Sequence, residues 1–82
     1  MKIVKAKIAK KEEKFVSILT DYIRLDAALK LADAVQTGGH AKIVITEGNV
    51  KVNGEVCMQR GKKLRDGDTF EMNHVMYHIQ KG

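Results

Sequence analysis

The first hydrophobic positions of the chain, in residues 3–8, follow a loose two-residue alternation with lysines on one side. This pattern is typical of a strand at the edge of a sheet, where lysine discourages pairing with other chains, and a flexible basic arm is the alternative. Residues 15–19 are short and rich in side chains that favour strands. We therefore predict a second strand, which can pair with the first as a hairpin.

The apolar positions then change to helical spacing. Leu25, Leu29 and Ala32 share one face at intervals of three and four residues. Asp26 can accept hydrogen bonds from the free amides of the first turn, so we predict that it caps this helix. Because the sequence then turns polar, the helix is expected to end near residues 33–35.

A second helix follows after a short polar connection. Thr37 is a natural N-cap, and Ala41, Val44 and Ile45 form an apolar face behind it. Gly48 suits the left-handed position that ends many helices. The two helices are thus predicted to be neighbours in space.

The second half of the chain has the pattern of short strands separated by turns. Asn53-Gly54 is the strongest short signal for a hairpin, because a type I′ turn needs positive φ at both central residues. The strands are expected at residues 50–52, 55–58, 69–72 and 75–79. We predict an α+β fold in which two helices pack against a small, mainly antiparallel sheet with an extra N-terminal strand or hairpin.

Composition fits one folded domain over residues 1–82. Hydrophobic residues make up 44% of the chain and charged residues 30%, as in ordinary folded proteins. The net charge of +5 favours a polyanionic partner, and the basic excess ends near residue 65. No apolar run is long enough to span a membrane, and lysines interrupt any signal-peptide core. We expect a cytoplasmic protein that does not associate with membranes, and its single cysteine excludes an internal disulfide.

Four short motifs follow one another along the chain: Arg24-Leu25-Asp26, Thr37-Gly38-Gly39-His40-Ala41-Lys42, residues 47–54, and Leu64-Arg65-Asp66-Gly67-Asp68. At this spacing they resemble the S4 RNA-binding domain family over about residues 22–72. The chain is most similar to the small stand-alone bacterial S4-like proteins of the YaaA and YbcJ type. The resemblance implies two helices on a small antiparallel sheet, with structured RNA docking across the helices and the following hairpin. Gly38 departs from the commoner family pattern, which has arginine at this position.

The glycines before the second helix form a candidate phosphate site. Gly38 and Gly39 allow close approach to the backbone, and the first-turn amides and the helix dipole attract an anion. Thr37, His40 and Lys42 can contact the same phosphates. From the residues alone, a tight connection between the helices explains the two glycines equally well. The family resemblance favours phosphate contact.

A second group of basic side chains follows the second helix: Lys51, Arg60, Lys62, Lys63 and Arg65. Such a group can displace counterions from a nucleic-acid backbone, with a solvated basic surface as the alternative. Arg24 precedes the first helix, where the resemblance implies a basic residue that faces RNA. It can also pair with Asp26 or Asp21.

Other kinds of chemistry are disfavoured. Cys57, His74 and His78 are of the types that bind zinc, but four residues along a strand span about 13 Å, too far for both histidines to reach one ion. No pair of titratable groups has the arrangement of an active site, so we predict no enzyme activity, no cofactor and no metal. Because the few aromatic residues are expected in the core, Phe15 and Tyr22 among them, we predict no surface on which bases stack.

The sequence therefore indicates a non-catalytic RNA-binding module that docks structured RNA, ribosomal or transfer RNA, by phosphate and shape recognition. The ribosome is a candidate partner, and ribosome assembly or translation is the candidate process. A monomer is our expectation, although the residues leave the oligomeric state open. Two alternatives remain: a protein-interaction module that uses the same helical face, and a DNA-binding helix-turn-helix. For the latter, the second helix offers only His40, Lys42 and Thr46 as base readers.

Overall fold

The predicted α+β architecture is confirmed. The computed structural model describes residues 12–82, so the strand predicted at residues 3–8 lies outside the described part. No helix within residues 12–82 is long and apolar enough to cross a membrane. The elements, in chain order, are β1 (Glu12–Ile18), β2 (Ile23–Arg24), α1 (Leu25–Leu31), α2 (Gly38–Thr46), β3 (Lys51–Val52), β4 (Glu55–Val56), β5 (Lys63–Leu64), β6 (Thr69–Met72) and β7 (Val75–Lys81).

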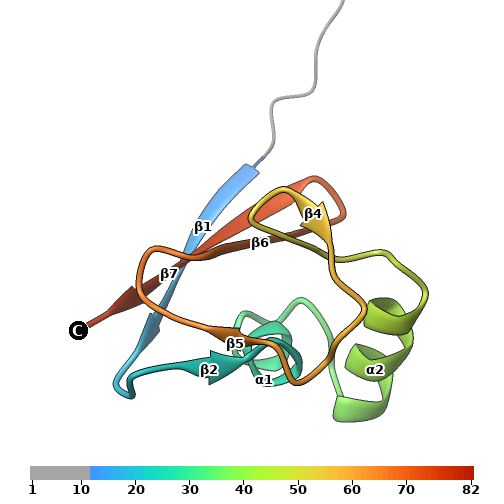
Figure 1. Ribbon diagram of the computed structural model, residues 1–82, viewed down its shortest axis with the longest axis horizontal. Coiled ribbons are helices and arrows are strands. Elements are labelled where there is room, and N and C mark those ends of the chain that lie inside the picture. Colours follow the sequence, from blue (N-terminus) through green and yellow to red (C-terminus); the bar gives the residue numbers. More distant parts are fainter. Residues whose placement is uncertain (1–11) are drawn as a thin grey trace, which may run out of the picture.

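Two sheets organise these strands. The larger has the order β1-β7-β6-β3-β4, and the smaller pairs β2 with β5. All pairings are antiparallel except that of β1 with β7, which is parallel and sets Val16 opposite Ile79. Figure 1 shows the larger sheet above a layer formed by α1, α2 and the β2–β5 pair. The strand predicted at residues 15–19 is therefore present as β1, and its partner within the described part of the chain is the C-terminal strand β7.

One apolar core lies between the larger sheet and the helices. The rings of Phe70 on β6 and Tyr77 on β7 stack with centroids 4.7 Å apart, and α1 and α2 contribute their predicted apolar faces. No charged or polar side chain of residues 12–82 is buried. The buried residues are Val16, Ile18, Leu25, Ala28, Leu29, Val35, Ala41, Ile45, Val50, Val52, Leu64, Phe70, Met72, Tyr77 and Ile79.

Two aromatic side chains that were expected in the core are exposed. Phe15 is 65% exposed, and Tyr22 is 40% exposed. Alternation along β1 turns Val16 and Ile18 toward the core, so Phe15 must face outward. Tyr22 immediately precedes β2, whose inward residue is Ile23. The prediction was therefore wrong for Phe15 and Tyr22.

The start of α1 differs from the prediction. The helix begins at Leu25, its N-cap residue is Arg24, and no side chain caps it. Asp26 lies inside the first turn, where its Oδ1 accepts a hydrogen bond from the amide of Ala27. The helix ends at Leu31, two residues before the predicted range, with the following residues in a Schellman-type turn.

The end of α2 and the hairpin after it confirm the turn predictions. Gly48 follows the C-cap residue with φ of +79°, and its amide donates to the carbonyl of Ile45. Asn53 and Gly54 both have positive φ, 51° and 90°, as a type I′ turn requires. The Oδ1 atom of Asn53 also accepts a hydrogen bond from the amide of Thr69, which ties the hairpin to β6.

Candidate nucleic-acid interface

The start of α2 presents free backbone amides to solvent. Thr37 caps the helix as predicted, because its Oγ1 accepts a hydrogen bond of 3.0 Å from the amide of His40. The amide of Ala41 bonds to the Thr37 carbonyl. Helix geometry therefore leaves the amides of Gly38 and Gly39 without an intrahelical acceptor. No acidic side chain lies in this first turn, so nothing there offsets the positive end of the helix dipole.

The two glycines are not required by the packing of the helices. A Cβ atom added at Gly38 would meet nothing within 4 Å, and one at Gly39 would approach only the Thr37 hydroxyl oxygen, at 3.9 Å. Neither glycine has positive φ. This argues against a tight helix connection as the reason for glycine here. It leaves the backbone of the first turn open to an outside group.

A shallow hollow of about 570 Å³ joins this helix start to α1. Its lining includes Gly38 from α2, Arg24 from β2, and Asp26 and Lys30 from α1. Two cations, one carboxylate and the open helix start therefore surround one hollow. Lys30 was not among the predicted residues. Its signal was present in the sequence, since it lies four residues after Asp26 on the polar side of the same helix.

Arg24 connects the hollow to the basic loop, which we define as residues 60–65. Its Nη2 is 3.1 Å from Oδ2 of Asp26, so the predicted pairing with Asp26 is confirmed, whereas Asp21 pairs with Lys81 instead. A Cβ on Gly61 would lie 3.7 Å from the same Nη2. The guanidinium of Arg24 thus lies beside the backbone of the basic loop.

Backbone hydrogen bonds hold the basic loop at the start of α1. The amide of Leu25 donates to the carbonyl of Lys62 at 2.8 Å, and that of Asp26 donates to the carbonyl of Arg60 at 3.1 Å. Strand pairing then sets Lys63 opposite Arg24. These carbonyls accept from the first two amides of α1, which begins one residue before the predicted cap Asp26. The loop is therefore part of the fold of the helix start, and its cations are held close to Arg24.

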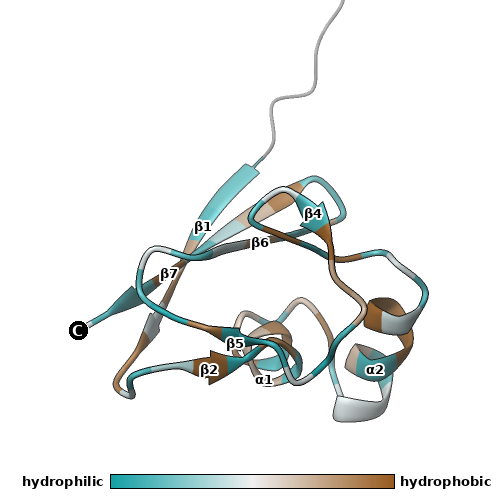
Figure 2. Cartoon of the chain, in the orientation of Figure 1, coloured by the Kyte–Doolittle hydropathy of each residue, from teal (hydrophilic) through white to brown (hydrophobic). Residues whose placement is uncertain are grey.

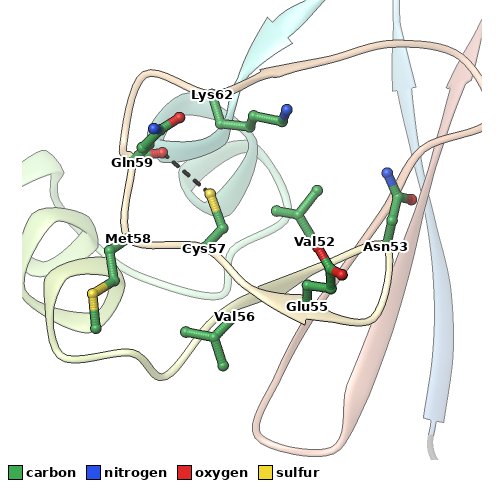
Figure 3. Close-up of a pocket in the computed structure, with 8 residues that line it drawn as sticks. All are labelled: Val52, Asn53, Glu55, Val56, Cys57, Met58, Gln59 and Lys62. Atoms are coloured by element: carbon green, nitrogen blue, oxygen red, sulfur yellow. Dashed lines mark hydrogen bonds between the residues drawn. The ribbon is translucent and has the colours of Figure 1, made fainter.

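The side chain of Lys62 does not line the hollow at the start of α2. It lines a second hollow, of about 460 Å³, together with Asn53, Glu55 and Cys57 (Figure 3). In that hollow the Cys57 thiol donates to the Gln59 carbonyl at 3.7 Å. Figure 2 shows the segment between β4 and β5 changing from hydrophobic to hydrophilic as it approaches the basic loop. Lys62 thus extends the basic surface toward the β3–β4 hairpin.

The remaining predicted residues lie on α2, in the basic loop and on β3. His40 and Lys42 are exposed on α2, and Arg60 and Arg65 are exposed at the two ends of the basic loop. Lys51 is the outlying member. It lies on β3 opposite Glu71, and it lines a different hollow together with Glu71 and His74. The structure thus brings Arg24, Gly38 and Lys63 together and leaves Lys51 at the periphery.

The histidines and the cysteine are separated into different surroundings. The Nε2 atom of His78 lies 2.9 Å from Oε1 of Glu13, and its ring stacks on Phe15. His74 is in the β6–β7 turn with φ of 65°. Residues 12–82 contain no group of three or more histidine, cysteine or acidic side chains that could hold a metal ion.

Two comparisons with known proteins identify the family of this chain. The sequence model of the S4 domain family matches residues 16–80, which include every described element except the first four residues of β1 and the last residue of β7. The chain is also 47% identical over 57 residues to the probable ribosome maturation protein RlbA of Bacillus subtilis (strain 168). That alignment covers 70% of this chain and 80% of the relative. The chain therefore belongs to the S4 domain family.

Proposed function

We propose that this protein is a non-catalytic RNA-binding module that docks structured RNA by phosphate and shape recognition. The observation that supports this most is the position of Arg24. It lines the hollow at the open start of α2, and it lies beside the backbone of the basic loop. One arginine therefore links two groups of anion-binding elements into a single surface.

The mechanism is the neutralisation of phosphates by fixed cations and amides. The amides of Gly38 and Gly39 donate to one phosphate, and Arg24, Lys30 and Lys63 neutralise its neighbours along the strand. Release of condensed counterions then drives binding and makes it sensitive to salt. The proposed contacts are Arg24, Lys30, Thr37, Gly38, Gly39, His40, Lys42, Lys51, Arg60, Lys62, Lys63 and Arg65, with Lys51 and Lys62 at the rim.

The RNA is proposed to be ribosomal, with transfer RNA as the second candidate. The name of the relative, a probable ribosome maturation protein, supports ribosomal RNA during assembly of the ribosome. In this role the protein acts in the cytoplasm as a monomer that binds and releases RNA. It needs no cofactor for this.

Crosslinking in cells tests this function directly. Ultraviolet crosslinking followed by sequencing of the attached RNA should recover ribosomal RNA segments, clustered at a few structured sites. The variant Arg24→Gln should lose these clusters, and Lys14→Gln on β1 should keep them. Recovery of messenger RNA at random positions, or equal recovery with both variants, would argue against the proposal.

A docking site for another protein is the competing function, and one observation favours it. Val56 and Met58 are exposed apolar side chains that both lie close to Gly48 at the end of α2. A purification of the tagged protein with and without nuclease separates the two functions. Partners that remain after complete RNA digestion would favour protein docking, and partners lost on digestion would favour RNA binding.

A further inference from the structure

The β2–β5 pair has one buried and one exposed face. Leu64 is fully buried and Ile23 packs against the core, and the two lie opposite each other in the register. Neighbouring positions on a strand face the other way. Arg24 and Lys63, which form the next pair, therefore share the outer face with the positions two residues away, Tyr22 and Arg65. The outer face thus carries one aromatic ring and three cations.

Two contacts between cations and the Tyr22 ring agree with this placement. The Nζ atom of Lys63 lies 4.8 Å from the centroid of the Tyr22 ring, and Cζ of Arg65 lies 5.8 Å from it. Despite these neighbours, Tyr22 remains 40% exposed. Both contacts are attractive and favour this position of the ring, and part of the Tyr22 side chain remains accessible to an incoming group.

The other exposed aromatic residue has a different setting. Phe15, on β1, stacks on the ring of His78 with centroids 4.9 Å apart, and His78 in turn contacts Glu13. Phe70 and Tyr77 are buried. Within residues 12–82, Tyr22 is therefore the Phe or Tyr side chain that combines exposure with contacts to lysine and arginine.

We propose that Tyr22 stacks on an unpaired base of the bound RNA, while Lys63 and Arg65 neutralise the phosphates on either side of that nucleotide. Bases stack on aromatic side chains and on arginine planes, and each base carries its phosphates a short distance away. A base inside a helix has both faces covered, so the partner is a bulged, looped or terminal nucleotide.

This inference rests on the proposed RNA-binding function and adds a local preference to it. Arg24 belongs both to the outer face of β2–β5 and to the hollow at the start of α2. The stacking site is therefore continuous with the proposed phosphate site. An RNA helix that docks on the phosphate site would present a distorted nucleotide to Tyr22 only where its pairing is interrupted.

A pair of short hairpin RNAs tests the site. One has a continuous stem, and the other has the same stem with a single bulged adenosine. Their dissociation constants are measured at low salt for the wild type, Tyr22→Leu and Tyr22→Phe, with Phe15→Leu as the matched control. Far-UV circular dichroism of each variant checks that it is folded.

The expected result is that the wild type and Tyr22→Phe bind the bulged hairpin about 5- to 100-fold more tightly than the continuous one, and that Tyr22→Leu loses this preference. Phe15→Leu should keep it. Because the chain has no tryptophan, Tyr22→Trp also supplies a single fluorescent reporter, which the bulged hairpin should quench.

Two results would overturn the stacking site, and only the second would also overturn the proposed RNA-binding function. If the wild type binds both hairpins equally and with strong salt dependence, and Tyr22→Leu behaves like it, the stacking site is wrong and the phosphate site stands. If the wild type binds neither hairpin at low salt, the proposed function is wrong together with the stacking site.

Discussion

The amide of Leu25 donates a hydrogen bond of 2.8 Å to the backbone carbonyl of Lys62. This bond joins the first residue of α1 to the basic loop, although Lys62 lies 37 positions after Leu25 in the sequence. It gives the helix start an acceptor that no side chain supplies. It also fixes the loop cations beside Arg24, so the proposed RNA surface depends on the fold of this junction.

Leu64 should be essential to that junction. It is 0% exposed, and Leu64→Ala should lower the free energy of unfolding by about 2–5 kcal/mol, because it removes a buried side chain and leaves a cavity. Urea unfolding followed by circular dichroism measures this loss. Met58→Ala, at a position that is 59% exposed, is the control and should change stability by no more than about 0.5 kcal/mol. Equal effects of the two substitutions would show that the loop is not anchored through Leu64.

A substitution in the first turn of α2 should weaken RNA binding without lowering the stability of the fold. Gly39→Ala should leave the free energy of unfolding unchanged or raise it by up to about 1 kcal/mol, because alanine favours helix and the added methyl group has room. The same change should weaken RNA binding about tenfold, since the methyl group stands where a phosphate approaches the amides. Thermal unfolding and a filter-binding assay measure the two effects.

Thr37→Ala provides the comparison for this experiment. It removes the hydroxyl that accepts from His40, so it should cost about 0.5–2 kcal/mol of stability. If Gly39→Ala is as destabilising as Thr37→Ala, glycine is required at position 39 for the stability of the fold. The interpretation of the helix start as a phosphate site would then lose its support.

Arg24 should contribute to binding through its geometry as well as its charge. Arg24→Gln should weaken binding of structured RNA about tenfold, as expected for loss of a charged hydrogen bond to phosphate. Arg24→Lys should recover only part of this, because lysine binds phosphate as a point charge without the planar fork. Electrophoretic mobility shifts at fixed salt measure the series. Full recovery by lysine would mean that the charge alone matters.

Local sequence patterns predicted much of the fold, because local geometry determined it. The Thr37 cap, the Gly48 stop and the Asn53-Gly54 turn each depend on a few neighbouring residues, and all three are present. The parallel pairing of β1 with β7 was not predicted. It joins the two ends of the described chain, and periodicity along a strand does not identify a distant partner.

The candidate site was predicted in its residue types more than in its arrangement. Asp26 has the character of an N-cap, but the helix begins one residue before it, and carbonyls of the distant basic loop accept from the first two helix amides. Adjacent lysines in the loop diverge, with Lys62 over one hollow and Lys63 over the Tyr22 ring. Tyr22 was assigned to the core because it falls at a position that a small core was expected to fill. The β2–β5 register, which no local pattern reveals, sets it on the surface instead.

The most direct test of the RNA-binding surface is the dependence of affinity on salt for purified ribosomal RNA. A double variant, Lys42→Glu with Lys63→Glu, is compared with Lys14→Glu with Lys81→Glu, which changes the net charge equally on β1 and β7. The wild type should show a steep fall of log K with log salt. The first variant should lose at least about tenfold in affinity at low salt and show a slope shallower by about two, and the second should match the wild type. Equal losses in both variants would contradict the account, because net charge and not this surface would then determine binding.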